Sequence, residues 1–273
     1  MRVRFIQWLL ICSVFGCAQP SEPTINTSTS PREAANAPEV TKHDPPLVEK
    51  YLHSGELAKG EQTLLLALEK TPDDDQIRFG LGVLQFGRAV ERLGQSLHEY
   101  GAKADNTNVP FLRFPVPKND TPSTISYRAF GRVLDVFVAD LARAERTLAE
   151  VKNEKVKLPL RLASVRFDLT GGGKPTDKFI DVLTKLNGGR FDFLKNNPDF
   201  LVCFDRGDVA WLRAYCHLLS AAVEGYRAFD VEEEFDKRVR DVFPKVEPSR
   251  KKAVEGEFVL VVADAPRLGR FRK

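Results

Sequence analysis

The chain has 273 residues, and its 42% apolar content, including 19 phenylalanines, is enough to bury a sizeable core. Lys and Arg number 41 against 38 Asp and Glu, and this near balance excludes an extended nucleic-acid-binding surface. The sequence has no His-Glu-x-x-His, Cys-x-x-Cys or Gly-x-Ser-x-Gly motif. We therefore name no catalytic residues and expect no enzyme activity.

Residues 1–17 have the pattern of an export signal. A positive "MRVR" precedes the apolar run "FIQWLLICSVF", which is too short to span a bilayer as a helix, so it predicts a secretory signal peptide. The run ends in "VFGC", which resembles the lipobox of bacterial lipoproteins. That resemblance implies lipidation of Cys17, a place in the bacterial cell envelope and, because position 18 is not Asp, the outer membrane. The alternative is ordinary cleavage after Ala18.

Residues 18–46 predict a disordered tether. They contain six prolines and almost no large apolar side chains, so they cannot bury enough surface to offset the entropy of ordering. A flexible chain of this length reaches on the order of 30 Å, which would hold a folded domain, periplasmic or surface-exposed, clear of the lipid headgroups.

Residues 47–101 predict helices that resemble tetratricopeptide repeats. Characteristic positions of the repeat are matched by Tyr51, Gly60, Leu64, Ala67 and Pro72, and the next repeat's Leu-Gly pair by Leu81 and Gly82. Small residues allow the two helices of a pair to approach closely, and proline ends the second one. The match then fades at Gln85, His98 and Asn106. The resemblance implies a protein partner bound on the concave face of the helix pair.

Residues 102–121 predict a long irregular connection that is partly held to the core. The region 122–245 is expected to be helical, with its clearest helix opening at Thr121-Pro122. That helix has one apolar stripe, formed by Phe130, Leu134, Phe137, Leu141, Ala144, Leu148 and Val151. The stripe predicts packing within the chain rather than a coiled coil with a partner.

Apolar residues then alternate with a period of two, which predicts a short extended segment or a weak hairpin. They are Val156, Leu158, Leu160, Leu162, Val165, Phe167 and Leu169. A helix is expected to return at about 177–186.

The stretch "FDLTGGGKPTD" between these elements resembles a degenerate EF-hand calcium loop. Its ligands would be Asp168, Thr170, the carbonyl of Lys174 and Thr176, with Gly173 at the invariant glycine. The carboxylates of the third and fifth positions are missing, and Phe179 replaces the bidentate glutamate. We therefore expect a structural turn, and the alternative is a weak, millimolar calcium site. A phosphate loop is excluded by the glycine spacing and by Pro175 after the lysine.

The last long helix is expected to begin at Asp208 as its N-cap and, being apolar on two faces, to be buried centrally. A shorter helix should follow before Pro244. Cys203 and Cys216 either form a disulfide, which export would permit, or are two small apolar residues.

Residues 246–273 are expected to form a basic, poorly packed tail that contains one β-prone run, 258–263. That run either packs against 156–169 or stays unpacked, and we expect the second, because the helical pattern stops at Pro244.

The sequence thus predicts a mainly α fold, made of tetratricopeptide-like helix pairs and a helical C-terminal half with one short extended or hairpin segment. The whole chain resembles bacterial lipoproteins that join a tetratricopeptide-like segment to a degenerate calcium-loop region. The resemblance implies a membrane-tethered scaffold that binds a protein and uses no cofactor. Weak calcium binding is the alternative, and an enzyme of unrecognised type is the third possibility.

Overall fold

The computed structural model describes residues 44–107, 109–186, 192–230, 232–248 and 270–271. Eight α-helices occur in these ranges: α2 (Leu47–Ser54), α3 (Leu57–Lys70), α4 (Asp75–Glu99), α5 (Tyr127–Ala149), α6 (Phe179–Leu186), α7 (Asp192–Asn196), α8 (Arg206–Arg227) and α9 (Phe235–Val239). The strands are short: β1 (Lys157–Leu160), β2 (Arg166–Phe167), β3 (Asp177–Lys178), β4 (Val202–Asp205), β5 (Phe229–Asp230) and β6 (Arg270–Phe271). The predicted mainly α fold with a short hairpin segment is confirmed.

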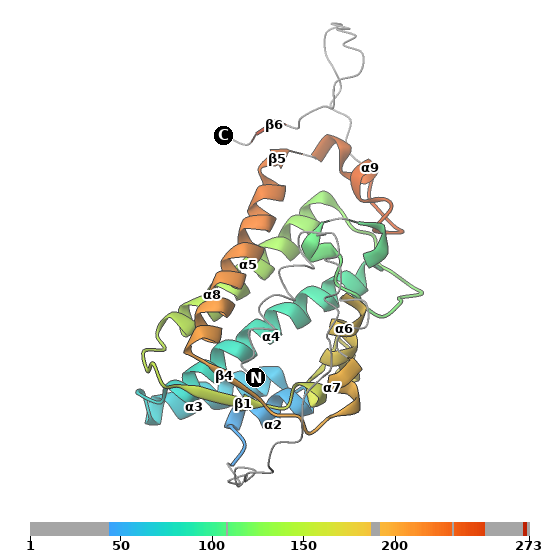
Figure 1. Cartoon of the computed structure of the whole chain (residues 1–273). Coiled ribbons are helices and arrows are strands. Elements are labelled where there is room, and N and C mark those ends of the chain that lie inside the picture. The colour runs from blue at the N-terminus through green and yellow to red at the C-terminus, as the bar shows by residue number, and fades with distance from the viewer. Residues whose placement is uncertain (1–43, 108, 187–191, 231, 249–269, 272–273) are drawn as a thin grey trace, which may run out of the picture. The chain divides into compact units, whose positions relative to one another are not determined.

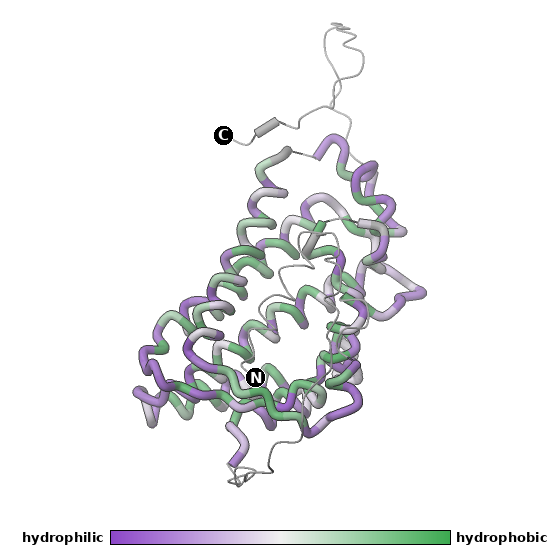
Figure 2. Tube along the Cα trace, in the orientation of Figure 1, coloured by the Kyte–Doolittle hydropathy of each residue, from purple (hydrophilic) through white to green (hydrophobic). Residues whose placement is uncertain are grey.

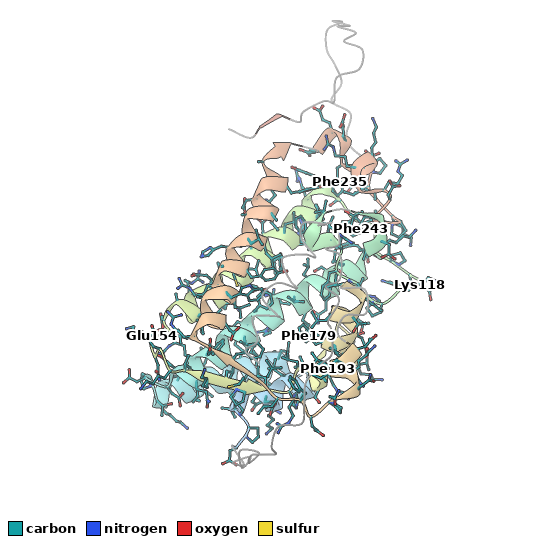
Figure 3. All side chains as sticks on the ribbon, in the orientation of Figure 1. Lys118, Glu154, Phe179, Phe193, Phe235 and Phe243 are labelled. Atoms are coloured by element: carbon teal, nitrogen blue, oxygen red, sulfur yellow. The ribbon has the colours of Figure 1, made fainter. Side chains whose placement is uncertain are left out.

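The long helices α4, α5 and α8 form the main body of the described helices, and α5 contacts both of the others (Figure 1). Hydrophobic residues recur along all three between hydrophilic ones (Figure 2). Every residue of the stripe predicted for α5, from Phe130 to Val151, is buried. Near α9 the core is aromatic, and Figure 3 labels two of its members, Phe235 and Phe243, which both contact the ring of Phe130.

Helices α2, α3 and α4 contact one another in the segment that resembles tetratricopeptide repeats. Its second half differs from a helix pair, because residues 75–99 form one continuous helix. The apolar spacing continues through Ala89, Leu93 and Leu97, all buried in the core that α5 shares, so nothing in this stretch ends the helix.

The close approach expected at Gly60 is present. A Cβ atom built there would lie 2.6 Å from both Leu84 Cδ1 and Tyr51 Cβ. Gly131, in contrast, is a helical glycine whose added Cβ would meet nothing within 4 Å.

We expect Gly60→Ala to lower the free energy of unfolding by about 1–3 kcal/mol, because the added methyl overpacks the α2–α3–α4 contact. Gly131→Ala should instead raise it by about 0.5–1 kcal/mol, since alanine favours the helix and no neighbour is displaced. Urea unfolding of both variants checks this, and equal effects at the two positions would contradict the close-approach role of Gly60.

Two predicted helix starts were wrong. Helix α5 begins at Tyr127, because the Ser126 hydroxyl accepts from Ala129 N at 3.1 Å, while Ile125 pairs its backbone with residues 245–247 instead of entering the helix. Helix α8 begins at Arg206 with Asp205 as its N-cap. Asp208 is the third helical residue and accepts from Asp205 N at 2.8 Å, which completes a capping box.

The central burial predicted for α8 holds for one face only. Val209, Cys216, Leu219 and Val223 are buried. The second stripe is half-buried, and there Trp211 stacks on Tyr215, whose ring contacts Phe86 of α4. The helix therefore lies against α5 with one side partly open.

The period-two segment supplies strands to two separate pairs. β1 pairs antiparallel with β4, from Lys157 opposite Asp205 to Leu160 opposite Val202. β2 pairs with β3 across the glycine loop, so the weak hairpin is 166–178. At the end of the chain, β5 and β6 pair, whereas the run 258–263 lies outside the described residues.

Candidate functional site

The extended segment 151–169, here called the strap, is held on α2 and α4 by buried carboxylates that accept from its backbone. Glu49 accepts from Arg161 N at 2.7 Å, and Glu91 accepts from Asp168 N at 2.9 Å. Asp75 accepts from two successive amides, Lys152 N at 2.7 Å and Asn153 N at 2.6 Å. All three acids are buried, so each bond is formed where water competes little.

The same two helices also donate to carbonyl oxygens of the strap. His53 Nε2 donates to Arg161 O at 3.0 Å, Gln76 to Lys157 O at 2.8 Å and Gln95 to Asp168 O at 2.9 Å. Strand-like backbone that has few strand partners thus obtains its hydrogen bonds from helix side chains.

The apolar side of the strap completes the core beneath it. The residues predicted to face inward, namely Val156, Leu158, Leu160, Val165, Phe167 and Leu169, are all buried and share one cluster with α2, α3 and α4. Leu162, in a short 3₁₀ turn, is only partly buried. The chain itself therefore covers the surface of α2 and α4 that the strap contacts, so this surface is not open to solvent.

The glycine loop is organised by the carboxylate of Asp168. Oδ1 accepts from Thr170 Oγ1 at 3.0 Å and from Gly171 N at 2.9 Å, and Oδ2 accepts from Gly173 N at 2.6 Å. Gly171 and Gly173 both have φ of 73°, a left-handed conformation that glycine adopts without strain. This is the geometry that a structural turn requires.

The expected calcium ligands do not form a set of free oxygens. Besides Asp168 and Thr170, the Lys174 carbonyl accepts from Thr176 N at 2.9 Å. Asp177 accepts from Leu169 N at 3.1 Å. Within the described ranges, no group of three or more His, Cys, Asp or Glu side chains is placed to hold a metal ion. A hard cation that needs six to eight oxygens does not fit this donor set.

The carboxyl of Glu91, which accepts from the backbone of Asp168, has a raised pKa. Burial raises the pKa of its carboxyl from 4.5 to about 7, and the nearby charge of Asp168 adds to the increase, while the Asp168 amide and Arg88 oppose it. A carboxylate is therefore held close to a second one in the core, and Glu91 is half-protonated near neutral pH.

The two cysteines considered for a disulfide are both free. Cys203 lies exposed on β4 and Cys216 is buried in the α8 face of the core. Burial raises the pKa of the Cys216 thiol to about 12, so it is a small apolar residue here, and the disulfide interpretation was wrong. Cys17 lies outside the described residues.

A second polar cluster lies across α3, α4 and α5, away from the strap's hydrogen bonds. We define the arginine cluster as Arg88, Arg92 and Arg143 with the buried acids Glu61 and Asp140. Arg88 pairs with Glu61, and Arg92 Nη1 donates to both oxygens of Asp140 at 3.0 and 2.8 Å. Arg143 lies 3.6 Å from each acid. A small hollow is lined by these five residues and Gln85.

The hydrogen bonds of Gln85 account for one departure from the repeat pattern. It stands where the repeat has tyrosine, and its amide donates to Glu61 at 3.1 Å while its carbonyl accepts from Thr147 at 2.7 Å. The sequence pattern marked Gln85 only as a departure from the repeat and did not predict the hollow that it helps to line. The available signal was a charged residue inside an apolar helix face, as at Glu61 between Gly60 and Leu64.

Among the described residues, no helix is both long enough and apolar enough to cross a membrane. Comparisons of the chain with protein-family models, curated proteins and solved structures found no match.

Proposed function

We propose that the protein is an exported, membrane-tethered helical scaffold that binds another protein and has no catalytic activity. Lipid on Cys17 would anchor it in the bacterial envelope, with the outer membrane favoured, and residues 18–46 would be the tether. The support for export and anchoring is the sequence of residues 1–17.

The observation that carries the interaction role is the outward surface of α3 and its neighbours. Leu65 and Leu66 are 45% and 57% exposed on α3, although they are large apolar residues. Leu65 follows Glu61 by one helical turn, so it lies beside the arginine cluster, and Val136 precedes Asp140 in the same way on α5. Apolar residues around a group of arginines are the composition typical of protein interfaces.

A cross-linking experiment on the full chain in its own cell envelope tests this proposal. A photoreactive phenylalanine analogue at Leu66 is expected to capture a defined protein, whereas the same analogue at Lys118, an exposed loop position (Figure 3), should not. The Cys17→Ala chain should lose both membrane fractionation and cross-link. Equal products from Leu66 and Lys118, or none from Leu66, would contradict the proposal.

The calcium alternative has less support, because Asp168 is the one carboxylate among its expected ligands and already accepts three hydrogen bonds within the loop. Titration of the full chain with Ca²⁺ remains its direct test.

A further inference from the structure

The two acids of the arginine cluster do not neutralise all of its positive charge, and they do not accept from all of its N–H donors. Three guanidinium groups face two carboxylates, which leaves one positive charge in excess. Arg92 uses only Nη1 toward Asp140, and Arg143 lies too far from either acid for a hydrogen bond, at 3.6 Å. Side-chain exposures of 42% for Arg92 and 46% for Arg143 leave the remaining N–H groups open to solvent.

Buried acidic side chains hold the cluster together, so it is not a chance grouping of surface charges. Glu61 and Asp140 are buried on α3 and α5, and they hold guanidinium groups that come from α4 and α5. The guanidinium groups of Arg88 and Arg92 are therefore held in place before any ligand arrives, which lowers the entropy lost on binding, and Arg143 lies within ion-pair distance of both acids. Guanidinium groups fixed in this way bind oxyanions through paired N–H donors.

Resting on the proposed function, we propose that the arginine cluster is the contact point for an acidic segment of the protein partner, which places one carboxylate against the exposed N–H groups of Arg92 and Arg143. One excess positive charge matches a carboxylate. A phosphate dianion would meet the uncompensated repulsion of Glu61 and Asp140. Leu65 and Val136 flank the cluster, so the segment carries apolar residues beside its acid.

The probes are a short peptide of alternating glutamate and leucine, its glutamine counterpart and inorganic phosphate, each titrated against the full chain in detergent. We expect the glutamate peptide to bind, the glutamine peptide to bind at least about tenfold more weakly, and phosphate not to displace it at equal concentration.

Arg143→Gln is the informative variant, because the Arg143 guanidinium makes no hydrogen bond to the described residues and its loss leaves the bonds of Arg92 in place. It should weaken the glutamate peptide about tenfold or more. Arg132→Gln removes the same charge from an exposed position about 16 Å along α5 and should leave binding within twofold. Thermal unfolding of both variants checks that the fold is retained.

Several outcomes overturn the inference: equal binding of the two peptides, equal loss in the two arginine variants, displacement by phosphate, or no binding at all. The cross-link from Leu66 separates this from the fate of the proposed function. If the cross-link persists undiminished in Arg143→Gln, the carboxylate contact is refuted but the proposed scaffold function is not. If no cross-link forms in any variant, the proposed scaffold function is refuted.

Discussion

Replacing Asp75 with alanine is expected to lower the free energy of unfolding by on the order of 3 kcal/mol. The variant loses the acceptor for Lys152 N and Asn153 N and the ion partner of Arg78, which lies 2.6 Å away. Burial alone would raise the pKa of Asp75, but the two backbone bonds and Arg78 outweigh it and leave that pKa below its usual 3.8. Urea unfolding near neutral pH, where the carboxylate is ionised, measures the loss.

Two neighbouring aspartates provide the controls. Asp74→Ala removes only the N-cap of α4, whose carboxylate accepts from Gln76 N and Ile77 N, and should cost about 1 kcal/mol. Asp73→Ala, at an exposed position, should change little. If Asp75→Ala proved no worse than Asp74→Ala, the bonds to the strap would contribute nothing to stability.

Replacing Glu91 with glutamine is expected to stabilise the protein above neutral pH by about 3 kcal/mol at most. This is the free energy that corresponds to raising the pKa of the Glu91 carboxyl from 4.5 to about 7 on folding. Glutamine keeps an acceptor for Asp168 N and removes the buried charge beside Asp168.

The direction of the pH dependence follows from proton binding. Since the folded pKa of Glu91 is the higher one, the folded state holds the proton more tightly than the unfolded state between pH 4.5 and 7. The wild-type contribution from Glu91 is therefore most favourable below pH 4.5, falls as pH rises through this window, and is fully lost above about pH 7.

Unfolding curves of wild type and Glu91→Gln at pH 5 and pH 8 check this, with the difference growing toward pH 8. Glu69→Gln, on the exposed side of α3, should show no such growth. A variant that is less stable than wild type at pH 8 would mean that the ionised carboxylate is needed there.

Local patterns predicted the elements and their inward faces. The four-and-three spacing of α5 and the alternation from Val156 to Leu169 depend on neighbours in sequence, and both predicted the buried side correctly except at Leu162, which is only partly buried. The glycine loop was also predicted as a turn, because its glycines and Asp168 act within a few residues of one another.

What sequence could not provide was the long-range pairing. β1 finds its partner in β4, more than forty residues later, through a register that no local signal encodes. Glu49, Asp75 and Glu91 are ordinary polar residues in a helical pattern until the strap covers them. The arginine cluster likewise needs α3, α4 and α5 in place before its charges meet.

The strap also has a kinetic consequence. Its hydrogen bonds to the helices join residues 73 to 112 positions apart, whereas α2, α3 and α4 contact their immediate neighbours in the chain. Loop closure over such separations is slow, so the helices should form first and the strap should dock late in folding. Contacts made after the transition state act on the unfolding rate. Asp75→Ala should therefore speed unfolding and leave the folding rate nearly unchanged, which makes the strap the element that sets how long the folded state lasts.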